Sequence, residues 1–103
     1  MGKAENRIES AVNNYAQQQG FLTRKYNSPN VRGVPDQIYF GYGQVFLMEF
    51  KAPNGVLSGH QEREIKRLKA HGVRVFVVDS IELGEQIVDG ARIVGEKESW
   101  HVM

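Results

Sequence analysis

Three charged residues stand at the ends of two apolar runs in the first half of the chain: Asp36, Glu49 and Lys51. Alternation along a strand places Glu49 and Lys51 on the same face. A hairpin turn at residues 42–43 would set Asp36 directly opposite Glu49, with Cβ atoms about 5 Å apart. Two carboxylates at that spacing repel each other, and binding of Mg²⁺ or Mn²⁺ by their hard oxygen atoms relieves the repulsion. The alternative is a simple ion pair between Lys51 and one of the acids at a sheet edge.

Two neighbouring features favour the metal site over the simple ion pair. Pro35 restricts the backbone directly before Asp36. Residues 3–19 show the spacing of an amphipathic helix, and Glu9 falls inside its apolar stripe, where it would face the sheet. Glu5 lies one turn earlier on the same stripe and is the alternative candidate for this third acid.

The segments around these residues resemble a known nuclease family. "VPD" at 34–36 followed by "MEFK" at 48–51 is similar to the PD-(D/E)XK nuclease motif, and "APNGVLSGHQ" at 52–61 resembles its VRR-NUC branch. That branch includes small stand-alone phage and bacterial proteins related to archaeal Holliday-junction resolvases. The resemblance extends from Glu9 to Asp79. It implies a restriction-endonuclease-like αβββαβ core, an α/β fold with a mixed sheet flanked by helices, and metal-dependent hydrolysis of DNA phosphodiester bonds.

The resemblance also implies roles for individual residues. Asp36 and Glu49 match metal-binding acids, with the backbone carbonyl of Phe50 as a further ligand. Lys51 matches the lysine that positions or activates the attacking water. Glu9 matches the acid of the first helix, as a catalytic group and metal ligand, and Gln61 matches a helix glutamine near the site. Gln61 has an alternative explanation, because with Ser58 it forms the sequence pattern of a helix capping box.

The elements that position these residues follow from hydrophobic periodicity and turn signals. A helix at 3–19 precedes strands at 21–26, 36–41 and 44–52, and a second helix lies within 57–72. The apolar run 73–79 predicts a central strand covered on both faces. A short third helix at 80–90 and a short strand at 91–94 complete the prediction, and the tail with Trp100 is unassigned. The expected architecture is one α/β domain spanning residues 1–103.

Composition narrows the remaining possibilities. The chain has 103 residues, is 41% hydrophobic and 24% charged, and has a net charge of +1, so an anionic partner would need a local basic patch. There is no cysteine, which excludes disulfides and thiolate chemistry. No apolar run is long enough to span a membrane, and no signal core is present, which predicts a cytoplasmic protein. The resemblance to phage proteins adds the expectation that it is encoded by a phage and acts in the cytoplasm of its host.

The loop before Asp36 is the predicted DNA-binding segment. Its basic and aromatic side chains would contact phosphates and a sugar or base: Arg24, Lys25, Tyr26 and Arg32. The resulting hypothesis is a structure-selective endonuclease for branched DNA such as Holliday junctions, dependent on Mg²⁺ or Mn²⁺ and acting as a homodimer. The alternatives are a nickase or flap nuclease of the same fold, or a non-catalytic DNA-binding module.

Overall fold

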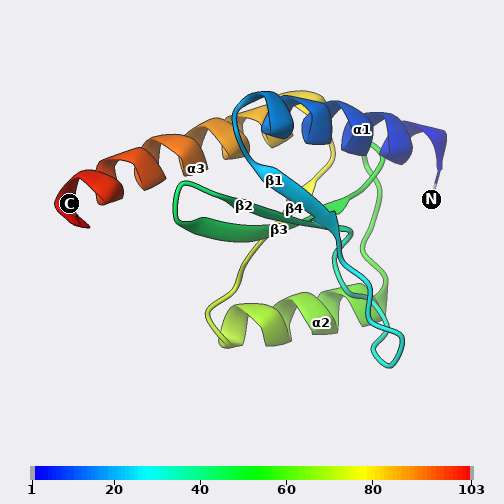
Figure 1. Ribbon diagram of the computed structural model, residues 1–103. Helices are drawn as coiled ribbons and strands as arrows, with labels where there is room; N and C mark the ends of the chain where they lie inside the picture. Colours follow the sequence, from blue (N-terminus) through cyan, green and yellow to red (C-terminus); the bar gives the residue numbers. More distant parts are fainter. Residues whose placement is uncertain (1, 103) are drawn as a thin grey trace.

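The structure, a computed structural model, describes the backbone of residues 2–102 and the side chains of residues 2–97. Helices and strands follow one another in the order α, β, β, β, α, β, α (Figure 1). Their bounds are α1 Lys3–Gln18, β1 Leu22–Lys25, β2 Gln37–Gly41, β3 Gln44–Phe50, α2 Gly59–Ala70, β4 Arg74–Val78 and α3 Ile81–Val102.

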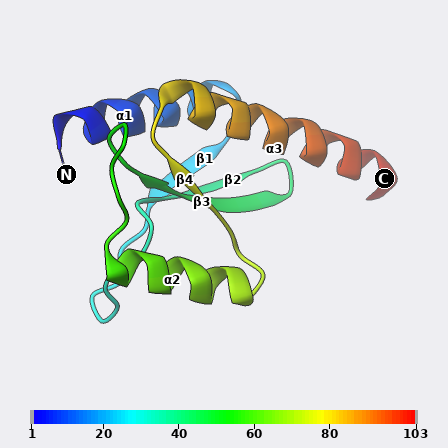
Figure 2. The ribbon, with the colours of Figure 1, turned by 180° about the vertical axis from the view of Figure 1, so that it is seen from behind.

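The strands form one mixed sheet in the order β1-β2-β3-β4. The first two pairings are antiparallel, and β3 pairs with β4 in parallel. Helices α1 and α3 cover one face of the sheet, while α2 alone covers the other face (Figures 1 and 2). The predicted α/β fold with a mixed sheet flanked by helices is therefore confirmed. In the described part of the chain, no helix combines the length and apolar character that a membrane crossing requires.

Each face of the sheet has its own apolar core. Phe46, Met48 and Phe50, each 0% exposed, point from β3 into the core beneath α1 and α3. Leu47 points to the opposite face, where it joins Ile65 of α2 and Val75 of β4. Glu49 lies two residues after Leu47 on β3, so strand alternation places it on the same side of the sheet, the side that α2 covers.

The β2–β3 hairpin has the register that the sequence predicts. Its turn consists of Tyr42 and Gly43, both with positive φ (55° and 73°), as expected for a two-residue hairpin turn. Gln37 pairs with Met48, so the next position outward brings Asp36 opposite Glu49. The N–H of Asp36 donates to the carbonyl of Met48 over 3.0 Å, which continues the pairing to this point.

The prediction that residues 73–79 form a central strand is wrong. β4 lies at one edge of the sheet, and β3 lies between β2 and β4. Val75 and Val78 are buried on opposite faces, but Val77 is 39% exposed. Helices cover much of both faces of the sheet, so a strand at its edge can also bury side chains on both faces. This packing explains the apolar run without a further strand beside β4.

The prediction of a helix at 80–90 followed by a strand at 91–94 is also wrong. α3 is one continuous helix through these residues. Within residues 81–97, its buried positions are Gly84, Val88, Ala91 and Gly95, which recur at helical spacing. Gly84 and Gly95 permit close packing, because a Cβ would lie 2.4 Å from Val12 or 2.2 Å from the carbonyl oxygen of Tyr42. Glycine and alanine supply much of the buried stripe of α3, so hydrophobic periodicity did not reveal the helix, and the apolar residues 91–94 indicated a strand instead.

Candidate active site

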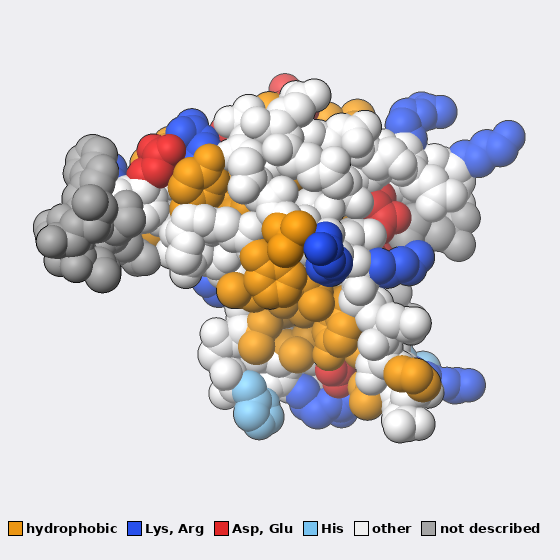
Figure 3. Space-filling model, in the orientation of Figure 1, with side chains coloured by type: hydrophobic (Ala, Val, Ile, Leu, Met, Phe, Trp, Pro, Cys, Tyr) orange, Lys and Arg blue, Asp and Glu red, His pale blue; other side chains and the backbone are white. Residues whose placement is uncertain are grey.

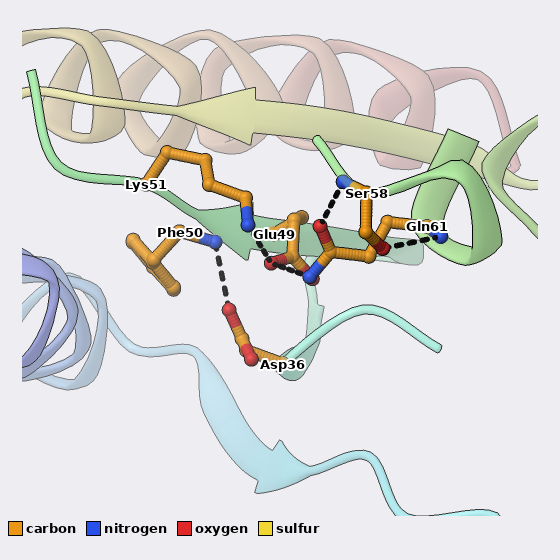
Figure 4. A network of polar contacts seen from close by, with 6 residues as sticks. All are labelled: Asp36, Glu49, Phe50, Lys51, Ser58 and Gln61. Carbon is orange, nitrogen blue, oxygen red and sulfur yellow. Dashed lines mark hydrogen bonds and ion pairs between the residues drawn. The ribbon is translucent and has the colours of Figure 1, made fainter. Parts of the chain in front are cut away.

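Asp36 and Glu49 form the centre of the candidate site, at the end of the β2–β3 hairpin where β2 begins and β3 ends (Figure 4). The backbone N–H of Phe50 donates to Asp36 Oδ2 over 2.8 Å, which fixes the side chain of Asp36 against β3. Glu49 is only 2% exposed. The predicted pairing of these acids across the hairpin is therefore present.

The burial of Glu49 has a large electrostatic consequence. Desolvation, followed by the negative charge of Asp36, raises the pKa of Glu49 from 4.5 to about 8, although Lys51 opposes this shift. Burial likewise raises the pKa of Asp36, against the opposing effect of the Phe50 N–H. Glu49 Oε1 is buried and has no hydrogen-bond partner among the described residues. A buried carboxylate oxygen without a donor is costly to the fold and marks a position where a cation or proton would be stabilised.

Lys51 and Gln61 bind the other oxygen of Glu49. Lys51 Nζ lies 3.8 Å from Glu49 Oε2, and both side chains are largely buried. Gln61 Nε2 donates to the same oxygen over 3.0 Å (Figure 4). Gln61 also completes the predicted capping box, because its Oε1 accepts from the N–H of Ser58 at 2.9 Å. The two explanations of Gln61 are therefore compatible, since its amide serves the helix cap through oxygen and the site through nitrogen.

Glu9 faces the sheet, as predicted. Its contact with the site is made through Gln37, a residue that was not predicted to belong to the site. Glu9 Oε2 accepts a hydrogen bond of 2.8 Å from Gln37 Nε2. The charge of Glu9 contributes to raising the pKa of Asp36, and the charge of Glu5 contributes to raising that of Glu49. Both helix acids therefore act electrostatically on the pair. The missed signal was strand alternation, which turns Gln37 toward α1.

The donor set fits a hard divalent cation at the centre of the site. Two carboxylates, one with an unpartnered buried oxygen, are the ligand type that Mg²⁺ and Mn²⁺ favour. In the region with described side chains, no three acids or histidines lie close enough together to hold a metal ion. Asp36 and Glu49 would therefore be its side-chain ligands, while ligation by Glu9 and by the Phe50 carbonyl stays a prediction.

The structure separates two of the residues predicted to contact DNA. Arg24 pairs with Ile38 and Lys25 with Gln37, so the two cations project to opposite faces of β1. Lys25 lies on the α1 side, where its charge opposes the rise in the pKa of Asp36. Tyr26 is partly buried against the core beneath α2, so packing alone accounts for an aromatic residue at this position.

A cluster of basic side chains lies at the start of α2 and consists of Arg32, His60 and Arg63. Arg32 Nη1 is 3.4 Å from His60 Nε2, and Arg63 Nη2 is 3.3 Å from His60 Nδ1. Gly33 allows this approach, because a Cβ there would lie 2.4 Å from the carbonyl carbon of His60. Neutral imidazole has one acceptor nitrogen, so it cannot satisfy both guanidinium groups. By contrast, Arg67 one turn later forms an ion pair of 2.8 Å with Glu64.

The comparisons with known proteins identify the family of this chain. The VRR-NUC domain matches residues 4–82, which include Glu9, Asp36, Glu49, Lys51 and Gln61. The chain belongs to the VRR-NUC family. It is similar to a protein of Acyrthosiphon pisum secondary endosymbiont phage 1 named "Putative nuclease p44", with 36% identity over 80 residues, 77% of this chain and 86% of the relative. A solved VRR-NUC domain superposes with a TM-score of 0.77 and 27% identity, covering 85% of this chain and 97% of that one.

Membership in the VRR-NUC family confirms the resemblance to PD-(D/E)XK nucleases that the motifs at 34–36 and 48–51 indicated. The region matched by the family ends at residue 82, so most of α3 lies beyond that match. Tyr15 of α1 nevertheless donates a hydrogen bond of 2.6 Å to Asp89 of α3. This extension of the helix therefore braces α1, the element that carries Glu9.

Proposed function

We propose that this VRR-NUC nuclease is a metal-dependent endonuclease that cuts branched DNA, with four-way junctions as the first candidate substrate. The observation that carries the proposal is the acid pair of the partly buried Asp36 and the buried Glu49, with an unpartnered Glu49 oxygen and Lys51 beside it. A protein that only binds DNA gains nothing from buried acids facing a phosphate, because such acids repel it. An acid pair of this kind has a use when it holds a cation against the phosphate.

The side chains would divide the work as follows. Asp36 and Glu49 would hold Mg²⁺ or Mn²⁺, which when bound would supply a more acidic water and neutralise charge on the phosphate. Lys51 would orient the attacking water and favour the anionic transition state. The Gln61 amide would hold Glu49 Oε2, so that the remaining oxygen faces the cation.

We propose a DNA path that crosses the site from Lys25 to the first turn of α2. Lys25 flanks Asp36 on one side, and Arg32 and Arg63 meet at His60, next to Gln61, on the other. These cations would bind phosphates and would not read bases. Their placement on two sides of the acid pair supports a substrate that bends or branches at the site. The proposal places this activity in the cytoplasm.

Resolution of a four-way junction requires two cuts, so we propose that the protein acts as a homodimer. Phe46, Met48 and Phe50 are core residues and so are not available for pairing of two subunits. Trp100 lies outside the residues whose side chains are described. Apolar side chains do gather over the open part of the sheet beside α2 (Figure 3), and Leu22 and Val45 of the sheet are 50% and 53% exposed. Light scattering of the protein alone and with junction DNA tests this part of the proposal.

The decisive experiment is a cleavage assay on duplex, flap, fork and four-way junction DNAs of equal length with Mg²⁺ or Mn²⁺. We expect junction cleavage by the wild-type protein and none by Glu49→Ala, because the variant lacks one of the two acids. Cleavage by Glu49→Ala at the wild-type rate would contradict the assignment of the site. Binding without cleavage under every divalent ion would instead favour the DNA-binding module, and cutting of a single strand would favour the nickase.

A further inference from the structure

Gln37 is a buried polar residue directly beside the acid pair. It follows Asp36, opens β2, and is only 8% exposed. Its Nε2 lies 2.8 Å from Glu9 Oε2. Because an ionised carboxylate only accepts hydrogen bonds, the amide must donate, which determines its orientation. Burying an amide costs free energy unless it is hydrogen-bonded, and Glu9 supplies the partner for this one, so the fold and the position of Glu9 depend on the same bond.

The contact is one of two similar contacts between β2 and α1. Tyr39, two residues along the strand, donates to Asn13 Oδ1 over 2.5 Å, and Asn13 lies one helical turn after Glu9. Two strand residues span about 6.6 Å and one helical turn about 5.4 Å, so the two pairs fit side by side. Both bonds join the same helix to the same strand. They differ in that only the Gln37 bond holds a charged group next to Asp36.

Glu9 needs such a partner to keep its position. Its side chain is partly exposed, and a glutamate without a bonding partner would turn toward water. Glu9 binds the residue that directly follows Asp36 in the chain, and its charge contributes to raising the pKa of Asp36. Among the residues whose side chains are described, Glu9 belongs to no group of three acids that could share one cation. Its distance from the pair is therefore set by the residue that holds it.

We propose that Gln37 is a positioning residue that holds the Glu9 carboxylate beside Asp36 during phosphodiester cleavage. The inference rests on the proposed nuclease function. In this role Gln37 touches neither DNA nor metal. It acts through Glu9, and its loss releases Glu9 to solvent and leaves the DNA path unchanged.

The test compares Gln37→Met with Tyr39→Phe in the full-length protein. Methionine has nearly the same length as glutamine and fills the same space, but it lacks the donor. We expect Gln37→Met to lower kcat about tenfold or more, since small misplacements of catalytic groups have effects of this size. Its Kd for junction DNA, measured by fluorescence anisotropy in EDTA, should change less than about twofold, because the DNA path is intact. Tyr39→Phe removes the matched bond to Asn13, and we expect it to lower Tm and leave kcat unchanged.

The loss in Gln37→Met should not exceed the loss in Glu9→Gln, because Gln37 acts only through Glu9. A larger loss than in Glu9→Gln, an unchanged kcat, or an equal loss in Tyr39→Phe would each overturn the proposal. Thermal unfolding of Glu9→Ala, Gln37→Met and the double variant tests the contact independently of cleavage. The two changes should be non-additive, and additive effects would show that the bond does not form.

Parallel measurement of Glu49→Ala separates the two levels of inference. If Glu49→Ala abolishes cleavage and Gln37→Met leaves it unchanged, the role of Gln37 is wrong and the nuclease site stands. If the wild-type protein cuts no DNA, the proposed function fails, and the unfolding cycle still decides whether Gln37 holds Glu9.

Discussion

The side-chain amide of Gln61 joins the first turn of α2 to the buried acid Glu49 (Figure 4). Its nitrogen donates to Glu49 Oε2 over 3.0 Å, while its oxygen accepts a hydrogen bond from the backbone N–H of Ser58. One side chain thus couples helix formation to the geometry of the site. Because the two functions use different atoms of the amide, they can be separated by substitution.

Gln61→Glu should separate capping from activity. Glutamate can still accept from the N–H of Ser58, so the capping box is retained. It cannot donate to Glu49, and it adds a negative charge to the acid pair. We therefore expect Gln61→Glu to lose most cleavage activity while retaining helix content by circular dichroism. Ser58→Ala should do the reverse, with a loss of about 1 kcal/mol in stability and near-normal kcat. Equal activity of Gln61→Glu and wild type would leave Gln61 as a cap alone.

The stability of the metal-free protein should fall as pH rises. The pKa of Glu49 is about 8 in the folded protein against an ordinary value of 4.5. Because the folded state holds this proton more tightly, Glu49 contributes stability that is fully present below pH 4.5 and is lost as pH rises through about 8. We expect Tm in EDTA to decrease from about pH 5 to about pH 9 more steeply in wild type than in Glu49→Gln. Parallel curves for the two proteins would show that Glu49 ionises normally.

Addition of a divalent cation should offset this loss. A ligand that binds only the folded state raises the apparent stability, and a carboxylate site binds it in the deprotonated form. We therefore expect Mn²⁺ to raise Tm of the wild-type protein more at about pH 8.5 than at about pH 6. Asp36→Ala supplies the control, since it keeps Glu49 but removes the second acid. An equal Mn²⁺ shift in this variant would contradict binding by the pair.

The two acids of α1 should differ in importance. Glu9 is held by Gln37 next to Asp36, while the charge of Glu5 acts on Glu49 as its smallest contribution. We expect Glu9→Gln to lower kcat about tenfold more than Glu5→Gln, because positioned groups contribute most to catalysis. Single-turnover cleavage with excess protein measures both variants. The opposite order would assign the role to Glu5.

The basic group at His60 should contribute to DNA binding. Arg63 has no carboxylate partner among the described side chains, whereas Arg67 on the same helix is paired with Glu64. Arg63→Ala should weaken binding and reduce the slope of log Kd against log salt by about 1, the loss of one phosphate contact. Arg67→Ala is the matched control, and its slope should stay unchanged. Equal slopes for all three proteins would place the DNA elsewhere on the surface.

Much of the site could be predicted from local rules. Strand alternation placed Glu49 and Lys51 on one face, and the two-residue turn at Tyr42 determined that Asp36 lies opposite Glu49. The pattern at Ser58 and Gln61 predicted the cap. Each of these relations depends on residues near one another in sequence, where backbone geometry leaves few alternatives.

The remaining features depended on how separate elements pack together. The apolar run 73–79 is compatible with a central or an edge strand, and only the sheet order shows that β4 is at the edge. Residues 91–94 continue a helix because Gly84 and Gly95 allow α3 to approach Val12 and Tyr42 closely.

Some contacts within the site likewise depend on how separate elements pack together, and local sequence patterns do not predict them. The bond from Gln37 to Glu9 and the contact of Arg32 with His60 each join residues 28 positions apart in the sequence. No local periodicity encodes such a pair. The distance between the two side chains is determined by the packing of whole helices on the sheet, and that packing is a property of the tertiary structure.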